Sequence, residues 1–104
     1  MIPLRRITRA TVDVLEALLA SSEPIWGLRI IKQTGRHPGT VYPILERLES
    51  QGWVTSTWEK DGSRSGPRRR FHALTPEGRT AALHTCREHD QRRVANPRGQ
   101  WVTS

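Results

Sequence analysis

Three features of the amino-acid sequence predict a mainly α-helical fold with one small β-hairpin, in the α+β class. Residues 40–50 carry apolar side chains at the i, i+3, i+4 and i+7 positions of one helical face. Gly52 follows as a helix stop, and residues 53–58 switch at once to the β-branched and aromatic residues typical of a strand. A loop rich in glycine and serine then leads to a second strand over 68–74. A winged helix-turn-helix is therefore predicted, with three helices, a two-stranded wing and a C-terminal helix.

The first two helices are predicted from apolar periodicity and from the residues that interrupt it. Residues 8–20 place valine and leucine side chains on one helical face. A shorter second helix is expected over 25–34, and Gly35 ends it. Pro38 suits the first position of a third helix, because proline lacks the N–H that would be unpaired there. The sequence leaves the start of that helix open between Pro38 and Thr40.

The residues after the hairpin predict a fourth helix and a tail. Residues 75–77 are threonine, proline and glutamate, which suit the cap, the first position and the first turn of a helix. The helix is expected over 75–94, and residues 95–104 are expected to form a flexible tail. Residues 8–74 then constitute the winged helix-turn-helix domain.

The charge of the chain favours a polyanionic partner. The 104 residues are enough for one domain, and they carry a formal net charge of +7 with only 35% apolar residues. Such an excess is typical of nucleic-acid-binding proteins, the alternative being a solubilising surface. One cysteine excludes a disulfide within this chain and fits a reducing cytoplasm. No apolar run approaches the roughly 18 residues that could span a membrane. We expect a cytoplasmic protein with no membrane partner.

The N-terminal end of the third helix is the expected recognition surface. In helix-turn-helix docking this end meets base edges in the major groove. Thr40 can hydrogen-bond to a base edge or present its methyl group to thymine, and Tyr42 can reach a phosphate through its hydroxyl. The alternatives are a helix cap for Thr40 and a packing role for Tyr42. The DNA contacts expected from this part of the chain are Arg36, His37, Gly39, Thr40, Tyr42 and Arg47.

The predicted hairpin carries cations that the third helix lacks. Residues 58–72 contain five cations and two acids, whereas the exposed helix face is close to neutral. Each phosphate neutralised by such a cation releases a counterion, although a charge run can also be a solvated hairpin. Strand alternation places Arg68 and Arg70 on one face and Arg69 on the other, so the three are not expected to act alike. The DNA contacts expected from the wing are Lys60, Ser63, Arg64, Arg68 and Arg69.

Neither a metal nor a catalytic group is expected. Only Cys86 and His89 share a face of the fourth helix, with His84 away from it, and zinc needs more converging ligands than this. The chain offers no nucleophile with a base and an orienting group, and no glycine-rich phosphate loop, so we expect no enzyme and no cofactor. Trp53 and Trp58 are expected to brace the hairpin against the helices, the alternative being a platform for stacked bases or a small effector.

Several runs of residues between about 10 and 80 match one family pattern. They are residues 26–31 (WGLRII), 39–49 (GTVYPILERLE), Gly52, 69–71 (RRF) and 74–78 (LTPEG). Through these runs the chain resembles the PadR family of bacterial transcriptional regulators. The resemblance implies a dimeric winged-helix repressor whose dimerisation helix corresponds to residues 75–94. Two features depart from the pattern: Trp26 replaces the usual tyrosine, and the fourth helix is short and polar for a dimerisation element.

We therefore expect a transcriptional regulator that binds double-stranded DNA. It would be a homodimeric repressor on a near-palindromic operator, released by a small-molecule effector or a partner. The alternatives are an architectural or phage or plasmid accessory DNA-binding protein, and a winged-helix module that contacts another protein. The first and fourth helices are the expected dimer surfaces, because one winged helix reads too few base pairs to select a site alone. The expected contacts lie around Leu83 and Cys86, with Ala81 and Ala82 permitting close approach.

Overall fold

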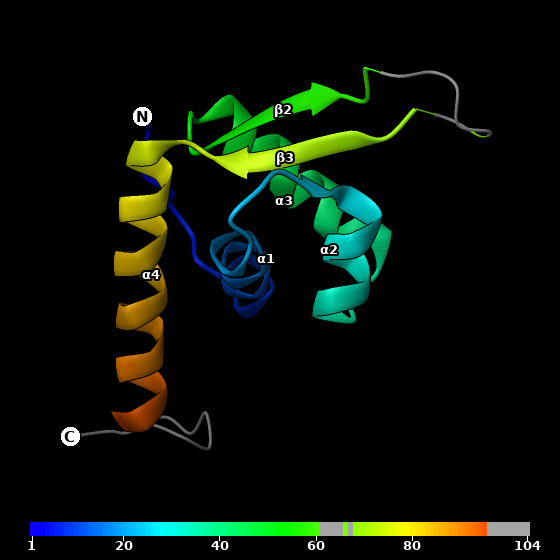
Figure 1. Ribbon diagram of the computed structural model, residues 1–104. Coiled ribbons are helices and arrows are strands. Elements are labelled where there is room, and N and C mark those ends of the chain that lie inside the picture. Colours follow the sequence, from blue (N-terminus) through cyan, green and yellow to red (C-terminus); the bar gives the residue numbers. More distant parts are fainter. Residues whose placement is uncertain (61–65, 67, 96–104) are drawn as a thin grey trace.

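In the part of the chain that the structure describes, four helices and three short strands make up the fold, and the first strand lies between the first two helices in the chain (Figure 1). The computed structural model describes residues 1–60, 66 and 68–95. The helices are α1 (Arg9–Ala20), α2 (Gly27–Thr34), α3 (Pro38–Ser50) and α4 (Pro76–Ala95). The strands are β1 (Ile25–Trp26), β2 (Val54–Trp58) and β3 (Arg70–Leu74). The predicted α+β winged helix-turn-helix is confirmed, with its helices and wing in the predicted order.

Ile25 and Trp26 form a strand instead of the start of the second helix. They pair antiparallel with β3, where Ile25 lies opposite His72 and Trp26 opposite Phe71. The sheet therefore has three strands in the order β1-β3-β2, one more than the predicted wing. The expectation of a helix from Ile25 was wrong at this end, because the β-branched and aromatic pair joins the sheet and α2 begins at Gly27.

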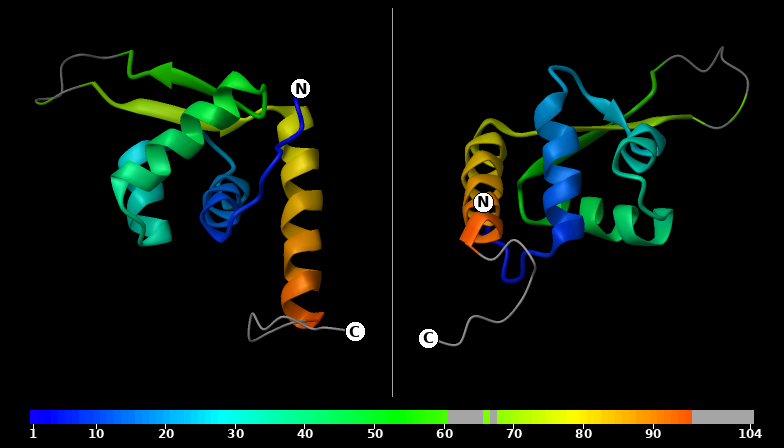
Figure 2. Two further views of the ribbon diagram at one scale, coloured as in Figure 1. Left: turned by 180° about the vertical axis from the view of Figure 1, so that it is seen from behind. Right: turned by 90° about the horizontal axis from the view of Figure 1, so that it is seen from below.

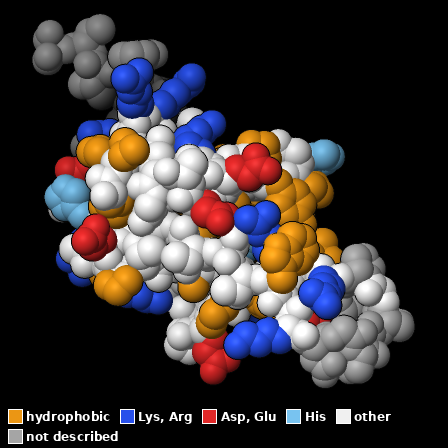
Figure 3. Space-filling view, turned by 90° about the horizontal axis from the view of Figure 1, so that it is seen from above, with side chains coloured by type: hydrophobic (Ala, Val, Ile, Leu, Met, Phe, Trp, Pro, Cys, Tyr) orange, Lys and Arg blue, Asp and Glu red, His pale blue; other side chains and the backbone are white. Residues whose placement is uncertain are grey.

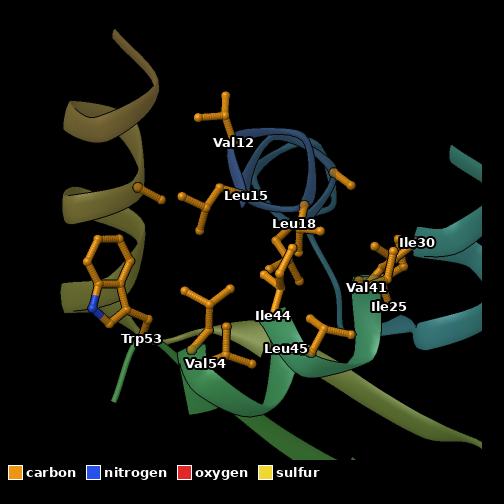
Figure 4. Close-up of a cluster of buried hydrophobic side chains, with 14 of the residues drawn as sticks. Val12, Leu15, Leu18, Ile25, Ile30, Val41, Ile44, Leu45, Trp53 and Val54 are labelled. Atoms are coloured by element: carbon orange, nitrogen blue, oxygen red, sulfur yellow. The ribbon is translucent and has the colours of Figure 1, made fainter. Parts of the chain in front are cut away.

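The hydrophobic core lies where α1, α2 and α3 meet the inner face of the sheet. Figure 4 shows side chains of α1 pointing toward those of α3 and toward the start of β2. The stripe predicted from the spacing in α3 is buried throughout, and its members are Val41, Ile44, Leu45 and Leu48. Burying a side chain of this size contributes about 1.5–3 kcal/mol. The core therefore holds α3 in place by one face and leaves the opposite face at the surface.

The two tryptophans of the hairpin differ in their surroundings. Trp53 is buried in the core, and its indole Nε1 donates a hydrogen bond of 2.7 Å to the Ile2 carbonyl oxygen. The bracing role expected for Trp53 is confirmed. Trp58 is 57% exposed at the far end of β2, so the same expectation was wrong for Trp58. The difference follows from position, since β2 leaves the body of the domain as it runs toward the hairpin tip (Figure 1).

The fourth helix starts as predicted. The Thr75 hydroxyl accepts a hydrogen bond of 2.9 Å from the Gly78 N–H and donates one of 3.0 Å to the Gly52 carbonyl oxygen. This cap fixes the start of α4 against the turn between α3 and β2. Among the described residues, no helix is both long enough and apolar enough to cross a bilayer.

One face of α4 packs on α1, and the helix then continues beyond α1 (Figures 1 and 2). Ala82 and Cys86 are buried in this intramolecular contact. The expectation that they meet a second copy of the chain was therefore wrong, because α1 of the same chain already covers them. Ala81 is half-buried beside the core, whereas Leu83 is 41% exposed on another side of the helix.

Candidate nucleic-acid interface

Helix α3 and the wing form the two walls of an open groove of about 300 Å³. The α3 wall carries Tyr42, Glu46 and Glu49, and the wing wall carries Trp58 and Arg68 among others. The groove runs along one flank of the buried stripe of α3, since its α3 wall includes Leu45 of that stripe, and the projecting hairpin lies beside this flank. The helix and the wing can therefore act on one ligand together.

His37 caps the N-terminus of α3. Its Nδ1 accepts a hydrogen bond of 2.9 Å from the Gly39 N–H, and Pro38 occupies the first helical position. The open question of where α3 starts is thus settled at Pro38. Thr40 lies inside the first turn, and its own N–H donates to the His37 carbonyl oxygen at 2.9 Å. The capping alternative for Thr40 was wrong, and Thr40 and its neighbour Gly39 are both exposed.

Arg36 and Tyr42 have partners within the fold. The Arg36 guanidinium donates from Nε to Oδ2 of Asp13 at 2.8 Å, which links the turn before α3 to α1. The Tyr42 ring packs against Gly27, where an added Cβ would lie 3.0 Å from Cε1. Tyr42 is nevertheless 42% exposed. Its ring therefore packs against the fold, as the alternative role expected, and part of the side chain also remains accessible at the surface. Arg47 is exposed on the next turns of α3.

The arginines at the start of β3 have different environments, as strand alternation predicts. Arg68 is exposed and pairs with no carboxylate among the described residues. The Arg69 guanidinium lies over the Trp26 ring, 4.1 Å from its centroid, on the other face of the strand. The Arg69 N–H also donates to Oε2 of Glu59 at 3.1 Å. Lys60 is exposed at the edge of the described wing, and the expected contacts Ser63 and Arg64 lie outside the described residues.

Arg70 forms a network with α3 that was not predicted from the sequence. Its Nη2 lies 3.0 Å from Oε1 of Glu49, and its Nε donates to the Ser56 hydroxyl at 3.0 Å. The Ser56 hydroxyl donates in turn to Oε2 of Glu49 at 2.7 Å. The Arg70 guanidinium also lies 5.5 Å from the centroid of the Trp58 ring. In the register of β2 and β3, Ser56 and Arg70 lie on the same face of the sheet. Knowledge of that register would have been needed to predict their contact.

His72 lies at the base of the groove and is buried. Burial lowers the pKa of its imidazole, and the nearby Arg70 guanidinium lowers this pKa further against an opposing effect of Glu49. His72 Nδ1 has no hydrogen-bond partner among the described residues. A neutral imidazole suits this site, because a charged one would be desolvated beside a cation.

The surface over the sheet does not form one continuous basic field. Figure 3 shows Lys and Arg side chains interspersed with carboxylates and with exposed hydrophobic groups on this face. Affinity for a polyanion therefore depends on particular cations, such as Arg68. It also depends on which of the remaining cations are neutralised by neighbouring carboxylates.

The three potential metal ligands of α4 do not converge. His84 pairs with Glu88 at 3.0 Å on the exposed side, while Cys86 packs into the core. Burial raises the pKa of the Cys86 thiol to about 11, so the thiol is protonated at neutral pH. Within the described part of the chain, no group of three or more His, Cys, Asp or Glu could hold a metal ion.

Known proteins match both the sequence and this arrangement. The model of the transcriptional regulator PadR-like family matches residues 14–84. Transcriptional regulator Rv3488 of Mycobacterium tuberculosis is 32% identical over 83 residues, which cover 75% of each chain. The solved PadR-like transcription factor from Bacteroides fragilis has a TM-score of 0.63 at 23% identity, with 82% of this chain and 85% of that chain covered. BpsR of Bordetella bronchiseptica has a TM-score of 0.70 at 22% identity, with 96% and 72% covered.

The family match spans the elements that build the groove, from α1 through the wing to the start of α4. The family is one of DNA-binding regulators and not of enzymes. The chain therefore belongs to the PadR-like family of transcriptional regulators.

Proposed function

We propose that this regulator is a homodimeric repressor that binds a near-palindromic operator and is released by a small-molecule effector. The observation that carries the proposal is the groove in which the exposed face of α3 and the wing lie side by side. Such a pair of elements suits DNA, because the helix can enter the major groove while the wing follows the adjacent backbone.

The exposed residues divide into those that select a sequence and those that supply affinity. Thr40 meets a base edge, and Gly39 permits close approach because it has no side chain. Tyr42 reaches a phosphate through its hydroxyl. The remaining backbone contacts come from exposed cations, namely Arg47, Lys60 and Arg68. The expected contacts Ser63 and Arg64, which lie outside the described residues, belong to the same proposed group.

Three of the expected contacts act mainly as supports. Arg36 is held by Asp13, His37 caps α3 and Arg69 stacks on Trp26. Each of these side chains positions a backbone segment that faces DNA. We propose that their effect on binding comes through that positioning, with only a minor direct contact.

Helix α4 provides the dimer surface in this proposal. Leu83 is exposed on one side of α4, and the helix extends past α1 (Figure 2). Met1 and Ile2 are also exposed near the start of the helix, where the first residues pair with the turn before β2. Apolar groups at the surface favour burial against a second copy. Two copies related by a two-fold axis place their α3 helices about 34 Å apart, one turn of B-DNA.

An effector is proposed to act near the same helix. An apolar groove of about 340 Å³ lies between the N-terminal segment and α4, and its lining includes Leu4, Ile7, Trp53 and Ala81. A volume of this order accommodates a small organic molecule. DNA binding of BpsR is regulated by 6-hydroxynicotinic acid, which supports the idea that a fold of this kind can transmit ligand binding. A ligand wedged against α4 would change the spacing of the two α3 helices.

Sedimentation tests the dimer directly. The free protein is expected to dissociate at low concentration, and DNA is expected to stabilise the dimer by mass action. At saturation the complex should contain two protomers per minimal high-affinity duplex. Leu83→Glu should weaken self-association, whereas Glu88→Gln, at an exposed position on a different side of the same helix, should not. One protomer per duplex at saturation would remove the dimer and favour an accessory DNA-binding role.

A further inference from the structure

The acidic Glu49 lies in a groove that we assign to DNA, and its carboxylate holds Arg70. We propose that Glu49 is a specificity-determining residue that withholds the Arg70 guanidinium from phosphates and so limits binding to unrelated sequences. The inference rests on DNA binding through the groove between α3 and the wing. It gives a role to Glu49, whose negative charge would otherwise repel the phosphates of DNA.

The geometry makes Arg70 a held cation and not a free one. Its Nη2 lies 3.0 Å from Oε1 and 3.3 Å from Oε2 of Glu49, so one nitrogen contacts both carboxylate oxygens. Ser56 completes the set, because its hydroxyl accepts from Arg70 at 2.8 Å and donates to Glu49 at 2.7 Å. Three side chains from α3, β2 and β3 thereby form one closed network.

The same guanidinium would be available to DNA if the carboxylate were absent. Arg70 and Arg68 lie on the same face of the strand, and both line the groove. The Arg70 side chain is 42% exposed and that of Glu49 is 34% exposed. A phosphate in the groove is therefore within reach of the cation, but it must compete with a carboxylate that is already in place.

Such an arrangement serves selectivity more than stability. An ion pair this exposed contributes little to folding, because water screens it and ordering two long side chains is unfavourable. A phosphate contact carries no sequence information, so a freed Arg70 would strengthen binding to every duplex alike. Holding it back lowers the non-specific background against which base contacts of α3 must select a site.

Glu49→Gln separates the charge of Glu49 from its shape. On a random-sequence duplex near 0.1 M salt, the variant should bind about five- to tenfold more tightly than the wild type, and its log–log salt slope should steepen by about 0.9, the value for one added phosphate contact. Glu46→Gln is the matched control, since it removes the same charge from the same groove wall but leaves Arg70 paired. It should leave the slope unchanged.

Arg70→Gln identifies the cation responsible. Alone it should leave the salt slope at the wild-type value, and in combination with Glu49→Gln it should abolish the gain. A slope reduced by about 0.9 in Arg70→Gln alone would overturn the proposal, because Arg70 would then contact phosphate in the wild type. An equal gain in Glu46→Gln, or a gain that persists without Arg70, would also overturn it. Circular dichroism melts verify that each variant is folded. Wild-type protein that binds no duplex would contradict the DNA assignment itself, which is a separate outcome.

Discussion

The Arg36 guanidinium donates a hydrogen bond of 2.8 Å to Asp13, and this contact joins the turn before α3 to the middle of the fold. The other carboxylate oxygen of Asp13 lies 3.2 Å from Nε of Arg9, one helical turn earlier in α1. One acid thus holds two cations. Because the turn leads directly into the His37 cap, Asp13 helps to set the direction of the N-terminus of α3, which we propose faces DNA.

Removing the charge of Asp13 should loosen this turn. Asp13→Asn is expected to lower the free energy of unfolding by about 0.5–1 kcal/mol, a modest loss because both pairs are partly exposed. Urea unfolding followed by circular dichroism measures the change. Glu16→Gln, at an exposed position of the same helix, is the matched control and should have a smaller effect. Equal losses in the two variants would show that the pairs of Asp13 contribute nothing particular.

Thr40 should govern the choice among sequences. Thr40→Ala is expected to cost about 1–3 kcal/mol on the cognate site and little on random DNA, because a base contact is lost. Thermal stability should stay close to that of the wild type, since His37 and not Thr40 caps α3. Titration of both duplexes with the same protein preparation provides the comparison. Equal weakening on both DNAs would place Thr40 at the backbone.

Arg68 should supply affinity that does not depend on sequence. Arg68→Ala is expected to weaken binding to every duplex and to flatten the log–log salt slope by about 0.9, the value for one lost phosphate contact. The matched control is Arg92→Ala, which removes the same charge from an exposed position of α4, away from the wing and on a different side from Leu83. If the two variants have the same slope, net charge alone explains the effect and the wing makes no direct contact.

His72 should make the fold less stable in acid. Burial and the nearby Arg70 lower the pKa of the His72 imidazole in the folded state. As the pH falls, His72 therefore becomes protonated in the unfolded chain before it does so in the folded protein. Stability should therefore fall as the pH drops below about 6.5, the ordinary pKa of histidine, and level off below the folded-state pKa. The free energy of unfolding measured between pH 7.5 and pH 4.5 shows the effect. His72→Gln should reduce this dependence more than His84→Gln does, because His84 is exposed.

The parts of the fold that the sequence predicted are those with local signals. The stripe of α3 and the cap at Thr75 depend on residues a few positions apart, and both were predicted correctly. Ile25 and Trp26 were expected in a helix. Their strand could not be predicted locally, because they pair with β3 residues that lie far along the chain. Trp58 was expected to pack inward for a similar reason, since nothing local indicates how far a hairpin projects.

The candidate site shows the same division. The exposed positions of α3 followed from its periodicity, whereas the partners of its charged residues did not. Glu49 and Arg70 meet only after β2 and β3 pair in the observed register, and Asp13 meets Arg36 only after α1 packs beside the turn. The sequence alone could show which cations exist in the wing, but the fold decides which of them remain free to bind a phosphate.

Selection of bound sequences from a random pool of double-stranded DNA tests whether α3 and the wing together recognise a sequence. We expect enrichment of a near-palindromic sequence whose half-sites are centred about 10 base pairs apart, one turn of the duplex. With Thr40→Ala protein the same selection should lose preference at particular positions of each half-site while DNA is still retained. A pool that stays random after repeated rounds, at a salt concentration where the protein still binds DNA, would contradict the claim that α3 and the wing together recognise a sequence.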